Sequence, residues 1–273
     1  MTWLVQAHRD ILRSLLRQHD LLWHLVVRDI GNRYRGSYFG FLWAIVNPLL
    51  LLAVYTFVFS VIMHSKWNPN AHEGRLDFAI TLFAGLLFFN VYADATNRSA
   101  SIIHDHKNYV KKVIFPLHFL PLITVISAFF TGFMSLCILC IAIWVFQSGF
   151  GWSALWLPVI IFPLFMMTSG AALIIAALGV YIKDVAQIVG LLNMLFMFLS
   201  PIFFPADKIP AALHGLATYN PLADVVTQAR AILVEHGHFH PGSWLMAMTI
   251  SGVILELGIL FFSTVKKGFS DVL

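Results

Sequence analysis

Six long apolar stretches constrain the fold of this chain more than any other feature. They are Tyr38–Met63, Phe78–Ala95, Leu117–Phe146, Leu155–Tyr181, Val185–Leu199 and Trp244–Thr264. An apolar run of about 20 residues can cross the hydrocarbon core of a bilayer as a helix. Only 11% of the 273 residues are charged, whereas about a quarter are charged in a soluble domain. The sequence therefore predicts an all-α membrane protein with six transmembrane helices.

The first 37 residues have a different pattern. Apolar side chains recur at helical spacing, as in Ile11, Leu15, Leu22 and Val26, while arginines fall mostly on the opposite side. Such a segment is too polar to span a bilayer and is typical of an amphipathic helix at the membrane surface. We expect residues 1–37 to form an interface segment and residues 38–273 to form the six-span domain.

Basic residues predict the orientation. Among the 17 Lys and Arg residues, all but Lys66, Arg75, Lys208 and Arg230 fall on the side that holds both chain ends in a six-span topology. Cytoplasmic segments carry the excess of Lys and Arg. We therefore expect a multi-pass protein of the cytoplasmic (inner) membrane with both termini in the cytoplasm. The net charge of +4 is explained by this pattern and does not indicate nucleic-acid binding.

Three further segments carry structural predictions. Residues 96–116 form a basic cytoplasmic connection. Residues 200–243 contain several prolines but also apolar residues at helical spacing, which predicts an extracytoplasmic hairpin that is re-entrant or built of short helices. Glycine and alanine are frequent between Gly170 and Gly179, which favours close approach of another helix.

The chain has no motif of a nucleotide-binding P-loop, a zinc protease or a serine hydrolase,. The alternating His236, His238 and His240 are compatible with a metal site, but polar loop residues explain them as well, and we assign no metal. Glu256 is an acid deep in a predicted span. An intramembrane carboxylate is a functional candidate by default, and Glu256 has either a pathway role or a packing role through hydrogen bonds.

Arginines and aromatic residues gather just before the first span. Arg33 and Arg35 suit the phosphates of lipids or of a lipid-linked substrate, but they also fit simple topology anchors. Tyr34, Tyr38 and Trp43 offer aromatic faces to sugar rings, and equally to lipid or to neighbouring helices.

Four segments, in order along nearly the whole chain, resemble those of ABC-2-type polysaccharide export permeases, which serve O-antigen, capsule or teichoic acid. They are RYRGSYFGFLWAIVNP at Arg33–Pro48, NYVKKVIFP at Asn108–Pro116, YIKD at Tyr181–Asp184, and SPIFFP at Ser200–Pro205 followed by YNPL at Tyr219–Leu222. The O-antigen type is the most similar.

The resemblance implies a homodimer of permeases that works with two copies of a separate ATPase, which would hold ATP and Mg²⁺. This chain would then need no cofactor and would not be an enzyme. The connection between spans two and three would dock on the ATPase. We expect His104, Asn108, Tyr109, Lys111 and Lys112 to belong to that coupling loop.

The resemblance also implies a substrate, a lipid-linked glycan that Arg33, Arg35, Tyr34 and Tyr38 would meet at the membrane surface. An ABC-2 exporter of drugs or lipids is the alternative. A secondary carrier is a weaker one, because the sequence shows no internal repeat.

Overall fold

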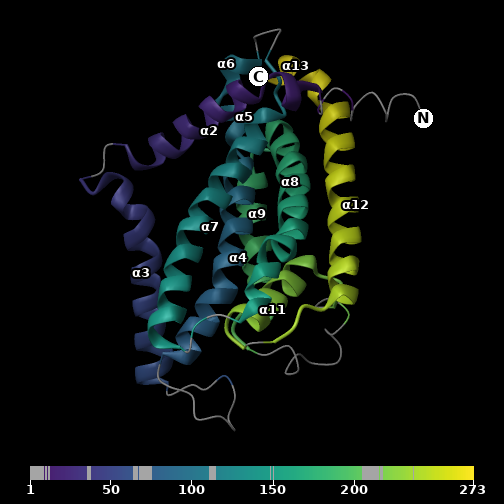
Figure 1. Cartoon of the computed structure of the whole chain (residues 1–273). Helices are drawn as coiled ribbons and strands as arrows, with labels where there is room; N and C mark the ends of the chain where they lie inside the picture. The colour runs from purple at the N-terminus through teal and green to yellow at the C-terminus, as the bar shows by residue number, and fades with distance from the viewer. Residues whose placement is uncertain are drawn as a thin grey trace.

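The computed structural model describes residues 9, 11, 13–35, 38–63, 67, 76–110, 115–147, 149, 151–204, 215, 218–235 and 237–273. These residues form helices and connections, with no strand among them. Figure 1 shows a bundle of long helices that run side by side, with shorter helices across both ends. The predicted all-helical fold is therefore confirmed for the described part of the chain.

Five helical stretches are long and apolar enough to cross a bilayer. The first, Gly40–Phe59, contains α3 (Trp43–Tyr55), and the second is α4 (Asp77–Ser99). The third is α7 (Phe119–Phe146), the fourth, Trp152–Tyr181, contains α8 (Leu157–Tyr181), and the fifth, Pro241–Val272, begins with α12 (Pro241–Val265).

The remaining apolar stretch forms α9 (Val185–Leu199), which has only 15 residues. At 1.5 Å per residue it is about 22 Å long, shorter than the hydrocarbon core of about 30 Å. It ends where Ser200 and Pro201 leave the helix. The prediction of a sixth span therefore stays a prediction.

The described core is built around α4. Most of its residues are buried, and they pack against α7, α8 and α11 (Pro221–Leu233). The helix continues to Ser99, so the cytoplasmic connection expected from residue 96 begins about one turn later. In contrast, α3 lies at the margin of the bundle (Figure 1). Only 11% of the most apolar part of Gly40–Phe59, which contains α3, is buried inside the protein, whereas the corresponding share for α4 is 83%.

The short helix α11 lies at one end of the bundle (Figure 1), within the segment 200–243 for which a hairpin was predicted. Leu222, Val225, Val226, Ala229 and Ile232 recur at helical spacing and are all buried. Asn220 caps this helix, since its side-chain oxygen accepts from the Leu222 amide at 3.0 Å. Residues 205–214 lie outside the described part, so the path of the whole hairpin is not established.

At the opposite end lie α2 (His19–Tyr34), α5 (Ile102–Asp105), α6 (Lys107–Val110) and α13 (Phe269–Val272) (Figure 1). The amphipathic helix α2 crosses the end of the bundle and buries Leu25 and Val26 against α5 and α7. The role of residues 1–37 as a membrane-interface segment stays a prediction. The chain segment leading into α3 and the C-terminal helix thus share one end.

Two glycines let α8 and α12 touch along their backbones. A Cβ placed on Gly258 would lie 2.5 Å from the Gly170 carbonyl oxygen, and a Cβ on Gly170 would clash with the backbone at Ile254 and Leu255. Gly179 approaches the Ala100 backbone in the same way. The close approach predicted from the small residues of the fourth span is confirmed.

Candidate functional site

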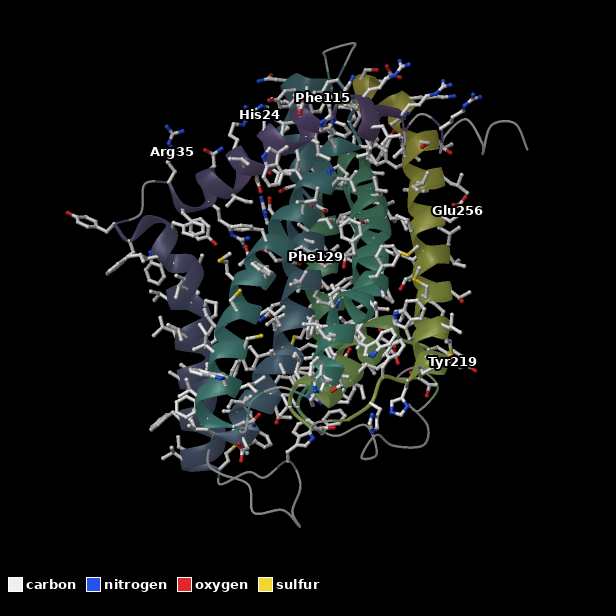
Figure 2. All side chains as sticks on the ribbon, in the orientation of Figure 1. His24, Arg35, Phe115, Phe129, Tyr219 and Glu256 are labelled. Carbon is white, nitrogen blue, oxygen red and sulfur yellow. The ribbon has the colours of Figure 1, made fainter. Side chains whose placement is uncertain are left out.

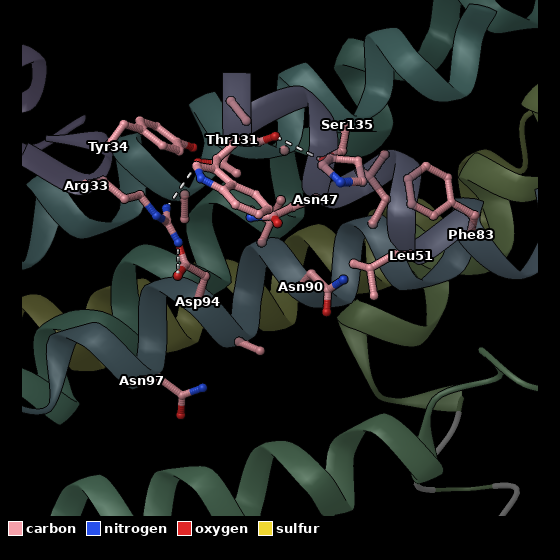
Figure 3. Close-up of a pocket in the computed structure, with 18 residues that line it drawn as sticks. Arg33, Tyr34, Asn47, Leu51, Phe83, Asn90, Asp94, Asn97, Thr131 and Ser135 are labelled. Carbon is pink, nitrogen blue, oxygen red and sulfur yellow. Dashed lines mark hydrogen bonds and ion pairs between the residues drawn. The ribbon is translucent and has the colours of Figure 1, made fainter. Parts of the chain in front are cut away.

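A cavity of about 580 Å³ lies between α3, α4 and α7 (Figure 3). It follows α4 from Phe83 to Asn97, about 21 Å along the helix axis,. Its wall is apolar at Phe83, Leu87 and Leu51. Its polar end is marked by Arg33 of α2 with Asp94 and Thr131. The other polar side chains that line it are Asn47, Asn90, Asn97 and Ser135. The volume is within the range of small-molecule pockets.

Arg33 and Asp94 face each other at the polar end of this cavity (Figure 3). Arg33 Nη2 donates to Asp94 Oδ1 at 2.6 Å, and Nη1 donates to Oδ2 at 2.9 Å and to Thr131 Oγ1 at 3.1 Å. Burial by itself lowers the pKa of Arg33, but the hydrogen bond and charge of Asp94 outweigh it and raise the pKa. Arg33 is therefore a permanent cation held by a two-bond carboxylate pair.

A second ion pair joins the same two helices with the charges exchanged. Arg98 Nη2 donates to both carboxylate oxygens of Asp29, at 2.6 and 2.7 Å. Asp29 precedes Arg33 by one turn of α2, and Arg98 follows Asp94 by one turn of α4. Neither Asp29 nor Arg98 borders the cavity.

The structure separates the residues predicted to meet a substrate into two groups. Arg33, Tyr34 and Trp43 line the cavity together. Arg35 is directed away from the bundle (Figure 2), and Tyr38 is fully exposed. The Tyr34 ring packs edge-on against Phe41 at 5.5 Å. Arg35 and Tyr38 are thus positioned outside the cavity, beside the helix that forms its outer wall.

The other predicted pathway residue, Glu256, is half-buried on α12 and does not border this cavity. Figure 2 shows it on the opposite side of the bundle from α3. The structure therefore does not bring Glu256 together with Arg33.

The predicted coupling loop forms two short helices at the end of the bundle that holds α2. His104 on α5 and Asn108 on α6 are exposed, while Ile102 and Ile103 are buried. Tyr109 stacks on Phe115 at 4.4 Å, and its hydroxyl accepts from Arg28 Nη2 at 2.9 Å. Lys111 and Lys112 lie outside the described residues.

Arg230, assigned above to the extracytoplasmic side, is buried within α11. Its Nε donates to the Thr81 carbonyl at 3.2 Å, and Nη1 and Nη2 donate to the Pro201 and Ile202 carbonyls at 2.9 and 3.1 Å. Burial lowers the pKa of Arg230 to about 10, so it stays charged at neutral pH. This guanidinium connects α4 and α11 to the break that follows α9.

Among the described residues no group of three His, Cys, Asp or Glu side chains is placed to hold a metal ion. His238 and His240 belong to that part of the chain, whereas His236 lies outside it.

Sequence reasoning missed the polar wall that α4 contributes. Asn90, Asp94 and Asn97 are spaced by four and three residues, so they share one face of a helix. That spacing within an apolar stretch was the available signal. Asp94 lies next to the expected end of the span at Ala95, where charged residues are common and do not by themselves indicate a site.

Helices long and apolar enough to cross a bilayer, with a polar cavity among them, are the features expected of a membrane transport protein. The ABC-2 type transporter family matches residues 20–234, and the chain belongs to this family. The chain is 30% identical over 264 residues to the O-antigen export system permease protein RfbA of Myxococcus xanthus, covering 96% of this chain and 98% of that protein. The protein of the same name from Klebsiella pneumoniae is 29% identical over 93% of this chain and 95% of its own length.

The polysialic acid transport protein KpsM of Escherichia coli is also similar, at 25% identity over 88% of this chain and 91% of that protein. The family resemblance drawn from the sequence is thus confirmed. Because this family consists of transport permeases, the chain is a transporter subunit and not itself an enzyme.

Proposed function

We propose that this chain is the transmembrane subunit of an ATP-driven exporter that moves a lipid-linked polysaccharide of the O-antigen type across the cytoplasmic membrane. The observation that carries the proposal is similarity along the whole chain to proteins named as O-antigen export permeases. The match covers 98% of the length of the Myxococcus xanthus protein. The capsule and polysialic acid transporters are similar at lower identity. Export of drugs or lipids has no such support.

The ATPase is a separate polypeptide, because the sequence has no P-loop,. Its docking surface is the exposed side of α5 and α6, with His104 and Asn108. Ile102 and Ile103 anchor this surface in the core, which lets a force applied there reach the helices. Lys111 and Lys112 complete the surface in our proposal.

The permease works as a homodimer with two ATPase copies. The support is the exposed apolar side of the short helix α9, where Leu191 is 66% exposed and Leu195 58%. A 15-residue helix is shorter than the bilayer is thick. Contact with a second permease relieves this mismatch, so the helix is more stable in a dimer than surrounded by lipid. The end that holds α2, α6 and α13 faces the cytoplasm, in agreement with its basic residues.

The substrate approaches past Arg35 and Tyr38, which are exposed, and reaches Arg33, Tyr34 and Trp43 in the cavity. Guanidinium groups at headgroup depth suit the phosphate of a lipid carrier. Trp43 offers an aromatic face beside them. Glu256, on the far side of the bundle, has a packing role.

The test is complementation in a bacterium that lacks its own O-antigen permease. The chain is produced together with a candidate ATPase subunit, and surface polysaccharide is measured by immunoblot. We expect polysaccharide at the surface with the active ATPase and none with an ATPase that cannot hydrolyse ATP. Efflux of dyes or lipids without surface glycan contradicts the proposal.

A further inference from the structure

The cation of the cavity is already occupied by an internal anion. The two terminal nitrogens of Arg33 meet the two carboxylate oxygens of Asp94 at 2.9 and 2.6 Å. A phosphate group binds a guanidinium through the same two parallel hydrogen bonds. Asp94 therefore occupies the position that a substrate phosphate requires.

Among the residues that the structure describes, Arg33 is the one Lys or Arg that borders the cavity. Arg98, one turn further along α4, is held by both oxygens of Asp29. Arg28 on α2 donates to Tyr109, away from the cavity. A phosphate brought next to the Asp94–Arg33 pair thus meets a carboxylate at close range, and like charges at such distances repel.

The wall of α4 offers new partners for a released carboxylate. Asn90 lies one turn before Asp94 and Asn97 nearly one turn after it, on the same helix face and in the same cavity. Side-chain amides at these spacings can donate to a carboxylate. The Arg33 and Asp94 side chains are 30% and 25% exposed, and both line the cavity, so both partners are accessible from it.

We propose that this cavity is a charge-exchange site, in which the phosphate of a lipid-linked sugar replaces the Asp94 carboxylate on Arg33. The inference rests on the proposed function. It adds a source of selectivity to that function, since Asp94 keeps Arg33 from binding anions of low affinity. The neighbouring polar groups, Asn47, Thr131 and Ser135, suit sugar hydroxyls, because amides and hydroxyls both donate and accept hydrogen bonds. The apolar part near Leu51 and Leu87 suits the first units of a prenyl chain.

The experiment measures binding to the full chain in phosphatidylcholine nanodiscs. The probe is farnesyl diphosphate linked to N-acetylglucosamine, and the variants are Asp94→Asn, Asp29→Asn and Arg33→Lys. We expect Asp94→Asn to bind about fivefold more tightly than the natural chain, because the competing carboxylate is neutral. Asp29→Asn, which breaks the matched pair outside the cavity, should bind like the natural chain, and Arg33→Lys about tenfold more weakly.

A purely structural Arg33–Asp94 pair predicts a different result. Both asparagine variants would then lower thermal stability alike, and neither would tighten binding. Asp94→Asn that is folded but binds no more tightly than the natural chain overturns the proposal.

A second measurement covers the case in which Asp94→Asn does not fold. Asn90 is exposed and lines the cavity, so Asn90→Cys is introduced after Cys137 and Cys140 are replaced by alanine. The probe should slow maleimide labelling of this cysteine at least about threefold, because only the unoccupied fraction of the chain reacts and the probe fills most of the sites. Unchanged labelling at saturating probe contradicts the inference.

Two further arms separate the sources of phosphate. Farnesyl diphosphate without sugar should bind more weakly than the sugar-linked probe, and phosphatidylglycerol should compete poorly. Equal competition by phosphatidylglycerol assigns the cavity to bulk anionic lipid and overturns its role with glycan. If the chain exports polysaccharide but Asp94→Asn shows no gain in binding, the inference fails while the proposed function stands. Absence of export removes the proposed function itself.

Discussion

The guanidinium carbon of Arg230 lies 4.2 Å from the centre of the Trp67 ring, so a buried cation is covered by an aromatic face and by three backbone carbonyls. No carboxylate among the described residues forms a salt bridge with it. The fixed fork of the guanidinium is what matches three separate acceptors.

Arg230→Lys should therefore destabilise the chain although it keeps the charge. An ammonium group cannot reach all three carbonyls, and each buried acceptor left without a donor costs about 1–3 kcal/mol. We expect a lower thermal unfolding midpoint in detergent, with Arg13→Lys, at an exposed position, as the control. Equal midpoints for the two lysine variants contradict the assigned role.

Gly170→Ala should disrupt the contact between α8 and α12, because the new methyl group meets the backbone of Ile254 and Leu255. Overpacking of this kind costs about 1–3 kcal/mol. Gly242→Ala is the matched control, since Gly242 lies on α12 and open space surrounds it. The readout is the amount of folded protein recovered in detergent, and a selective loss for Gly170→Ala is expected.

Lysine at Arg33 should reduce export more than lysine at Arg35. Both changes keep the positive charge, and hence the topology, but only Arg33 has a two-bond partner within the cavity. Surface glycan and membrane insertion are measured together in the complemented strain. Full export by the double lysine variant leaves topology anchoring as the role of both residues. Tyr38→Ala should weaken export by a smaller amount.

The α5–α6 surface should contact the ATPase. Cysteine at the exposed Asn108 is expected to crosslink to a cysteine on the ATPase, whereas cysteine at Leu16, exposed on the N-terminal segment, should not. Crosslinking from Leu16 alone would place the ATPase at the N-terminal segment instead. Tyr109→Phe removes the acceptor of Arg28 and should reduce transport per ATP hydrolysed without preventing the crosslink.

Glu256→Gln should retain export, because an amide can replace a carboxylate in packing and hydrogen bonding. Glu256→Leu should lose part of it. Export is compared at equal expression. Complete loss in Glu256→Gln shows that the charge itself is required and assigns Glu256 to the transport pathway.

The long helices of the bundle could be predicted, because a helix that contacts lipid or the protein core needs a long apolar run, and such a run is visible in the local sequence. The buried side of α11 could be predicted for the same reason, from Leu222 to Ile232. The pair of Arg33 and Asp94 could not, since 61 residues separate its members and no local pattern encodes which cation meets which acid. The burial of Arg230 was equally hidden, because its acceptors are backbone carbonyls that every residue possesses.

The two crossed ion pairs between α2 and α4 also fix how these helices align. Asp29 is opposite Arg98 and Arg33 is opposite Asp94, so the signs alternate along both partners. A slip of one turn in one direction would place Asp29 against Asp94, and a slip in the other would place Arg33 against Arg98. Either slip sets like charges face to face and is opposed. The two ion pairs therefore favour a single alignment of α2 with α4 and oppose sliding of one helix along the other.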